Sequence, residues 1–190
     1  IQRGTQVVVV DPRKINLVKD SALHLQVQAG TNVAFANGMM HVILKEGLAD
    51  RHFIEERTEG FSDLEKMVAD YTPEKVAEIC HIHPEDLIQA ARMYAKAEKA
   101  PIIYCLGVTE HSTGTEGVMS MSNLAMLVGK VGKPGCGVNP LRGQNNVQGA
   151  CDMGCMPYDF PGYQKVNNPE VIDKFEKAWH VPLNRNTGLT

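Results

Sequence analysis

The feature that most limits how this chain can fold is a long segment, from Gly129 to Gly162, that is dense in glycine and proline. Eight glycines and four prolines fall within it, and its apolar residues follow no regular period. This density of glycine and proline predicts irregular backbone. Irregular runs longer than about 15 residues are uncommon in compact domains unless they are functional loops or pass between domains. We therefore expect one domain before this segment and the start of another beyond it.

Two apolar runs before this segment are predicted to be strands, and polar residues follow each of them. Thr5–Asp11 is rich in β-branched residues and stops at Pro12, which cannot continue a strand ladder. Pro101–Gly107 is the second run, and residues 109–116 form a polar loop that leads into a helix at about residues 118–128. This alternation of strand, loop and helix is typical of α/β folds.

The residues between the two runs are predicted to be mostly helical. Leu23–Val27 alternates apolar and polar residues, and the turn after it starts a helix at about residues 33–46. Residues 50–98 show no obvious chemistry and are interpreted as a helical insertion. The clearest helix start in it is Thr72-Pro73-Glu74, with a capping residue, a proline and an acid in order. Four helices are expected there, at residues 50–56, 61–71 and 73–80 and from about residue 84.

The expected fold is thus an incomplete Rossmann-like α/β domain over residues 1–142, with a mostly parallel sheet flanked by helices. Residues 143–190 are expected to be a glycine-rich, cofactor-facing segment that leads into a second, partial domain. Polar side chains just past the carboxyl end of a strand face the crevice where α/β proteins bind ligands. Asp11 and Arg13 stand in this position. No GxGxxG motif follows Val7–Val10, which argues against a plain NAD-binding protein.

Composition excludes several classes of function. The formal net charge is -3 and the basic residues form no stripe, so no nucleic-acid partner is expected. No apolar run approaches the ~20 residues that cross a bilayer, so no membrane contact is expected either. The five cysteines form no CxxC pair, which argues against disulfides and a zinc ribbon and favours a reducing compartment such as the cytoplasm. We predict no metal ligand among these residues.

Amide side chains and an arginine gather inside the glycine-rich segment. Gln144, Asn145 and Asn146 offer both donors and acceptors, which suits the edges of a fused heterocycle, while glycines let backbone approach closely. Arg142 brings a planar, permanently charged fork that favours two-point contact with a carboxylate. On spacing alone, a structural ion pair is the favoured role for this arginine.

The run from Asn139 to Gly154, NPLRGQNNVQGACDMG, resembles the signature region of formate dehydrogenase alpha subunits in the molybdopterin oxidoreductase superfamily. Ser122–Leu127, Gly132–Gly135 and Pro161–Gln164 match the same family pattern in the same order. The similarity extends over essentially the whole chain. An ordered series of motifs is far more specific than any one of them.

The resemblance implies roles for particular residues. Arg142 corresponds to the arginine that lies beside the metal and contacts formate. The other residues implied in binding the molybdopterin guanine dinucleotide, which carries molybdenum or tungsten, are Asp11, Arg13, Gly30, Leu106, Gly107, Thr109, Glu110, His111, Gly143 and Gln144. Asn32 stands where the family has aspartate, and Glu110 where it often has glutamine. For His111, an ordinary loop role is as well supported as a cofactor contact.

The resemblance also implies that other parts of a longer subunit supply the [4Fe-4S] cluster and the metal ligand. We expect the chain, which starts at Ile1 without an initiating Met, to be a piece of such a subunit, inactive alone and prone to self-association. Its partners would be formate, the rest of the subunit and electron-transfer subunits. Two alternatives stay open: a sister oxidoreductase such as a nitrate reductase, and a non-catalytic α/β binding domain.

Overall fold

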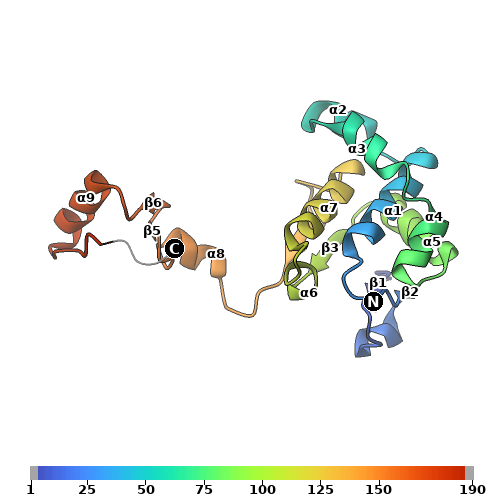
Figure 1. The fold of residues 1–190 in the computed structure, drawn as a ribbon, viewed down its shortest axis with the longest axis horizontal. Coiled ribbons are helices and arrows are strands. Elements are labelled where there is room, and N and C mark those ends of the chain that lie inside the picture. The colour runs from blue at the N-terminus through green and yellow to red at the C-terminus, as the bar shows by residue number, and fades with distance from the viewer. Residues whose placement is uncertain (1–3, 187–190) are drawn as a thin grey trace. The chain divides into compact units, whose positions relative to one another are not determined.

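A computed structural model describes residues 4–186, which form two compact units (Figure 1). The first unit ends at Leu141 and the second begins at Arg142. The outer ends of the two expected domains, Ile1 and Thr190, lie outside the described residues.

The first unit is of the α/β class and contains two separate pairs of parallel strands. Val9 of one pair lies opposite His24, and Ile102 of the other lies opposite Val138. The parallel pairing agrees with the sequence prediction, although each pair has only two strands. In chain order the elements are β1 (Val8–Val10), η1 (Asn16–Asp20), β2 (Leu23–Leu25), α1 (Asn32–Lys45), α2 (Arg51–Arg57), α3 (Phe61–Val68), α4 (Pro73–Cys80), α5 (Pro84–Lys96), β3 (Pro101–Tyr104), α6 (Leu106–Thr109), α7 (Gly114–Leu127) and β4 (Gly137–Pro140).

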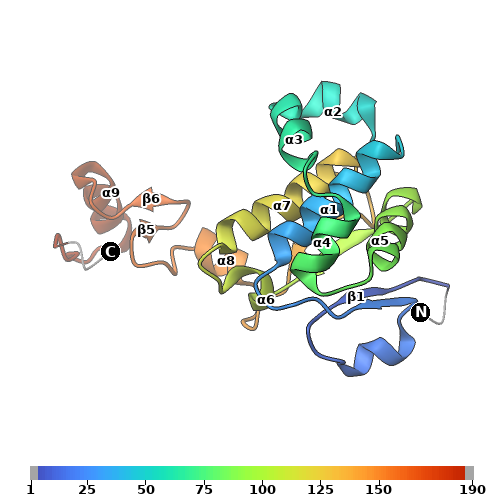
Figure 2. The same cartoon turned by 45° about the vertical axis from the view of Figure 1, so that its right-hand side comes forward.

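Helix α1 forms the centre of the core and packs against α4, α5 and α7, as Figure 2 shows. Its Met40 and Ile43 are fully buried, and burial of such side chains contributes about 1.5–3 kcal/mol each. Gly38 lets α4 and α5 approach, since a Cβ there would lie 2.8 Å from Val76 and 2.9 Å from Leu87. The predicted helical insertion therefore supplies much of the core.

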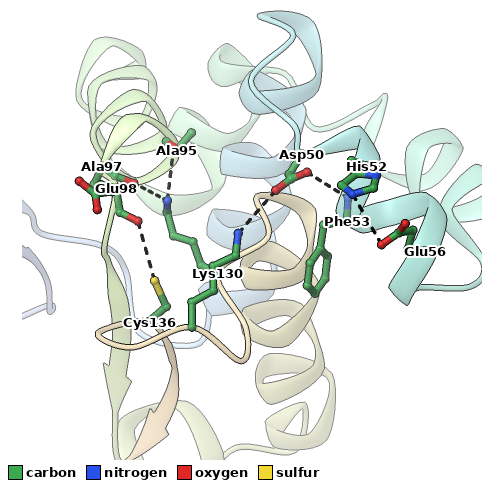
Figure 3. Close-up of polar contacts among 10 residues, drawn as sticks. Asp50, His52, Phe53, Glu56, Ala95, Ala97, Glu98, Lys130 and Cys136 are labelled. Atoms are coloured by element: carbon green, nitrogen blue, oxygen red, sulfur yellow. Dashed lines mark hydrogen bonds and ion pairs between the residues drawn. The ribbon is translucent and has the colours of Figure 1, made fainter.

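Capping residues fix the helix starts that the sequence indicates. The Thr72 hydroxyl accepts a hydrogen bond from the Lys75 amide, and Pro73 occupies the first turn of α4. The Asp50 carboxylate caps α2 in the same way by accepting from the Phe53 amide (Figure 3).

Lys130, which follows α7, ties that helix to the end of α5 (Figure 3). Its ammonium group donates to the carbonyl oxygens of Ala95 and Ala97, in the last turn of α5 and just after it. These carbonyls have no partner within the helix, so the lysine acts as a cap. The residue is only 5% exposed, and its burial lowers the pKa of the ammonium group.

The prediction for residues 101–128 was partly wrong. Strand β3 ends at Tyr104, and α6 occupies part of the expected strand and loop. Helix α7 begins at Gly114 rather than near residue 118, because its start packs closely on the residues of α6. A Cβ on Gly114 would lie 2.1 Å from the Thr109 carbonyl oxygen. Gly114 resembles a loop residue in the sequence, but close packing of the backbone requires a glycine there.

The second unit is more regular than the glycine-rich sequence predicts. It contains α8 (Val147–Asp152), an antiparallel pair of β5 (Asp159–Phe160) with β6 (Gln164–Lys165), and α9 (Pro169–Trp179). Phe160, Phe175 and Trp179 form its aromatic cluster, in which the first two rings stack with centroids 4.7 Å apart. The expectation of irregular backbone from Gly129 onward was therefore wrong for these elements and for β4, which are regular.

Among the described residues, no helix combines the length and apolar character needed to span a membrane. No group of three or more potential metal-ligating side chains lies together in residues 4–186.

Candidate functional site

Most of the candidate residues lie just past the carboxyl ends of the parallel strands. Asp11 follows β1, and Gly30 lies in the loop after β2. Gly107 lies in α6, three residues after the last residue of β3, and Arg142 comes two residues after the last residue of β4. The carboxyl ends of parallel strands are where α/β folds bind ligands. Asp11, Gly30 and Gly107 belong to the first unit and stand at such strand ends, whereas Arg142 is the first residue of the second unit.

A hydrogen-bonded junction joins the loop after β2 to the loop after β3. The Asn32 side-chain amide donates to the Gly107 carbonyl oxygen over 3.4 Å, and His111 Nε2 contacts the same oxygen at 2.9 Å. One ring nitrogen of His111 is thus engaged by the backbone four residues away, and its contact with a cofactor stays a prediction. Leu106 and Glu110 lie in the same loop, where the Glu110 amide donates to the Leu106 carbonyl.

Asp11 is oriented by its neighbours. Its Oδ1 atom accepts a hydrogen bond from the Arg13 amide at 2.7 Å and lies 3.5 Å from Arg13 Nε. The carboxylate is partly shielded, whereas the Arg13 side chain is 80% exposed. His24 contacts the Asp11 carbonyl oxygen through Nε2 at 3.1 Å, which holds the backbone beneath it. Both charged groups of this pair remain accessible to a polar ligand.

Two glycines in the candidate set have no structural requirement within the described chain. Nothing lies within 4 Å of a Cβ built on Gly107 or Gly143, and neither residue has a positive φ. Glycine inside a helix costs about 0.5–1 kcal/mol relative to alanine, so Gly107 is unfavourable for α6 itself. Bare backbone at each of these points is suited to close approach by a flat, polar group such as a pterin.

Arg142 leaves the end of β4 with its side chain exposed. The residue before it is fixed, because the Leu141 amide donates to the Tyr104 carbonyl oxygen at 2.7 Å. Among the ion pairs formed within residues 4–186, none includes Arg142. The open guanidinium contrasts with Arg185, which contacts both Asp173 and Glu176 at 2.6 Å.

Part of the signature segment folds the second unit. Asn146 adopts a left-handed conformation and caps α8, accepting from the Gly149 amide at 3.2 Å. The Asp152 carboxylate accepts from the Tyr163 hydroxyl at 2.6 Å, a bond that raises the pKa of Tyr163 to about 12. Gln144 is exposed and stays a candidate for ligand contact.

Sequence reasoning missed one residue beside Arg142. Cys105 directly follows β3, and its thiol donates to the Leu141 carbonyl oxygen at 2.8 Å. In the sequence, Cys105 belongs to an apolar run. The only sequence feature that could have indicated a role for it is its position directly before Leu106.

The α/β fold, with loops that follow the carboxyl ends of parallel strands, is one that many cofactor-binding domains use, and the comparison with family models identifies the class of protein. The molybdopterin oxidoreductase family matches residues 1–185, and the chain belongs to that family.

Curated relatives narrow this further. The chain is 50% identical to the F420-dependent formate dehydrogenase subunit alpha of Methanocaldococcus jannaschii, over 99% of this chain and 28% of that protein. It is 49% identical to formate dehydrogenase H of Escherichia coli, over 98% of this chain and 26% of that protein. The chain thus spans about a quarter of the length of these relatives.

A solved structure supports the fold. Acetylene hydratase from Pelobacter acetylenicus superimposes with a TM-score of 0.68 at 28% identity, over 70% of this chain and 18% of that one.

Proposed function

We propose that the whole protein containing this chain is the catalytic subunit of a formate dehydrogenase, which oxidises formate to carbon dioxide. The observation that carries the proposal is Arg142, an exposed guanidinium at a strand end with no ion-pair partner in residues 4–186. Near 50% identity to two formate dehydrogenase subunits supports formate rather than another oxyanion.

The proposed cofactor is molybdopterin guanine dinucleotide with molybdenum or tungsten. Asp11, Arg13 and Gly30 would hold its guanosine end, because a carboxylate and a guanidinium can pair with the polar edges of a base and ribose. Gly107 and Gly143 would let backbone approach the pterin. The remaining proposed contacts are Leu106, Thr109, Glu110, His111 and Gln144. When bound, the cofactor supplies the two-electron redox chemistry.

The proposed task of Arg142 is to bind and orient formate. A guanidinium contacts both carboxylate oxygens at once, which fixes the rotation of the substrate as well as its position. Formate held in this way directs its C–H bond away from the arginine, toward the reacting centre. Correct orientation of a bound substrate accounts for a large share of many catalytic rate enhancements.

Other parts of the protein complete the proposed enzyme. They would supply the metal ligand and a [4Fe-4S] cluster, neither of which we assign to this chain, and electron-transfer subunits would accept the electrons. The isolated chain is expected to be inactive. We also propose the cytoplasm as the compartment, which suits the five free cysteines.

The test is the Arg142→Lys variant of the full-length protein. Lysine keeps the charge but loses two-point contact, so kcat/KM for formate should fall at least tenfold. Arg185→Lys is the matched control, because that arginine already has two carboxylate partners. Formate turnover unaffected by Arg142→Lys would refute the assigned role.

Two alternative functions give different outcomes in the same assays. A sister enzyme such as a nitrate reductase would turn over nitrate and leave formate unchanged. A non-catalytic binding domain would turn over neither substrate in the full-length, cofactor-loaded protein.

A further inference from the structure

Cys105 lies where it can control the position of Arg142 without touching a ligand. It directly follows β3, and its thiol donates to the Leu141 carbonyl oxygen at 2.8 Å across 36 positions of sequence. That oxygen belongs to the peptide group that links Leu141 to Arg142. Because a peptide group is planar and rigid, fixing its oxygen also fixes the direction of the Arg142 amide and Cα.

A second hydrogen bond holds the same residue from its other side. The Leu141 amide donates to the Tyr104 carbonyl oxygen at 2.7 Å and continues the pairing of β3 with β4 by one residue. Leu141 is therefore hydrogen-bonded to two consecutive residues. The Leu141 amide donates to Tyr104, and the Leu141 carbonyl accepts from Cys105. Beyond it, the Arg142 side chain has no hydrogen bond or ion pair within residues 4–186. These two hydrogen bonds, which we call the clamp, hold the backbone directly before Arg142.

We propose that Cys105 is the positioning residue for Arg142, so that its hydrogen bond sets the angle at which the guanidinium meets formate. This inference rests on the proposed function of Arg142. The required chemistry is a donor at the end of a short side chain. Serine supplies one, since its hydroxyl is a stronger donor than a thiol on a side chain of the same shape, and alanine does not.

The experiment compares Cys105→Ala and Cys105→Ser in the full-length subunit, with Cys155→Ala as the control because that thiol is also exposed. Loss of one ordinary hydrogen bond corresponds to about a two- to tenfold effect. We expect kcat/KM for formate to fall by this factor in Cys105→Ala and to recover in Cys105→Ser. A fall of equal size in both variants would overturn the proposal, because the donor would then be irrelevant.

A second measurement does not depend on turnover. The Leu141 amide reports the clamp, since its bond to Tyr104 protects it from hydrogen exchange. Exchange should be about two- to tenfold faster in Cys105→Ala, with wild-type values in Cys105→Ser and Cys155→Ala. Unchanged exchange in Cys105→Ala overturns the positioning role whatever the turnover.

A double-mutant cycle separates this inference from the function on which it rests. If Cys105 acts through Arg142, adding Cys105→Ala to Arg142→Lys should cost no further activity. If Arg142→Lys lowers kcat/KM and Cys105→Ala lowers it further by the same factor as in the wild type, the positioning role fails. The proposed function then still stands. If Arg142→Lys is harmless, the proposed function itself fails.

Discussion

The Asn32 side-chain amide donates to the Gly107 carbonyl oxygen, joining the start of α1 to the loop after β3 over 75 positions of sequence. The two loops carry candidate residues from different strand pairs. His111 contacts the same oxygen, so both acceptor positions of the Gly107 carbonyl are engaged. The bond therefore holds these two segments of the first unit together.

Replacement of Asn32 by Asp should uncouple these loops with little change in global stability. A carboxylate cannot donate to a carbonyl, and loss of this long, exposed bond costs less than about 1 kcal/mol. An acid in the first turn of α1 gains about 0.3–1 kcal/mol from the helix dipole, which offsets that loss. Hydrogen exchange across residues 105–111 should accelerate while the unfolding midpoint stays within error. Asn32→Ala should accelerate the same exchange and lower the midpoint.

Replacement of Lys130 by Met should destabilise the first unit by about 1–3 kcal/mol. Two carbonyls at the end of α5 lose a charged donor, and relief from burying the ammonium group only partly compensates. Lys133→Met is the control, since that lysine is exposed and its ammonium group lies 3.8 Å from the Asp50 carboxylate. Its effect should stay below about 0.5 kcal/mol. Equal shifts of the urea midpoint in both variants would contradict the capping role of Lys130.

The helices were the part of the fold that sequence predicted well. Helix α4 occupies the predicted residues, because capping threonine, proline and acid all act locally. Helix α9 was missed although Asn168-Pro169-Glu170 carries the same signal, with the Asn168 side chain accepting from the Glu170 amide. The preceding glycines drew the interpretation toward irregular backbone. The start of α7 was misplaced because the need for Gly114 comes from a tertiary contact.

The site was predictable only where position along a strand determines it. Asp11 was correctly placed after a strand because β1 is a β-branched run that ends before a proline. The bonds of Asn32 and Cys105 were not predictable, since each joins residues far apart in sequence. Whether the candidate residues contact the cofactor stays a prediction.

The bond between Tyr163 and Asp152 should make the second unit sensitive to alkaline pH. Donation to the carboxylate raises the pKa of Tyr163 to about 12, above its ordinary value of about 10. A raised pKa means that the contribution of this bond is complete below pH ~10 and is lost as pH rises through ~12. In Asp152→Asn the Tyr163 pKa should return toward the ordinary value. NMR titration of the labelled tyrosine ring measures it, and identical titrations would contradict the assignment.

Alanine at Gly107 and at Gly114 should separate folding from cofactor binding. At Gly114 the new Cβ would lie 2.1 Å from the Thr109 carbonyl oxygen, so α7 must shift and stability should fall by more than about 2 kcal/mol. At Gly107 nothing lies within 4 Å, and alanine in α6 should stabilise the helix by about 0.5–1 kcal/mol. The full-length Gly107→Ala protein should nevertheless retain less molybdopterin, because the added methyl group occupies the surface offered to it. Normal cofactor content in a stable Gly107→Ala protein would mean that the glycine serves no ligand, and the cofactor face of this loop would have to be placed elsewhere.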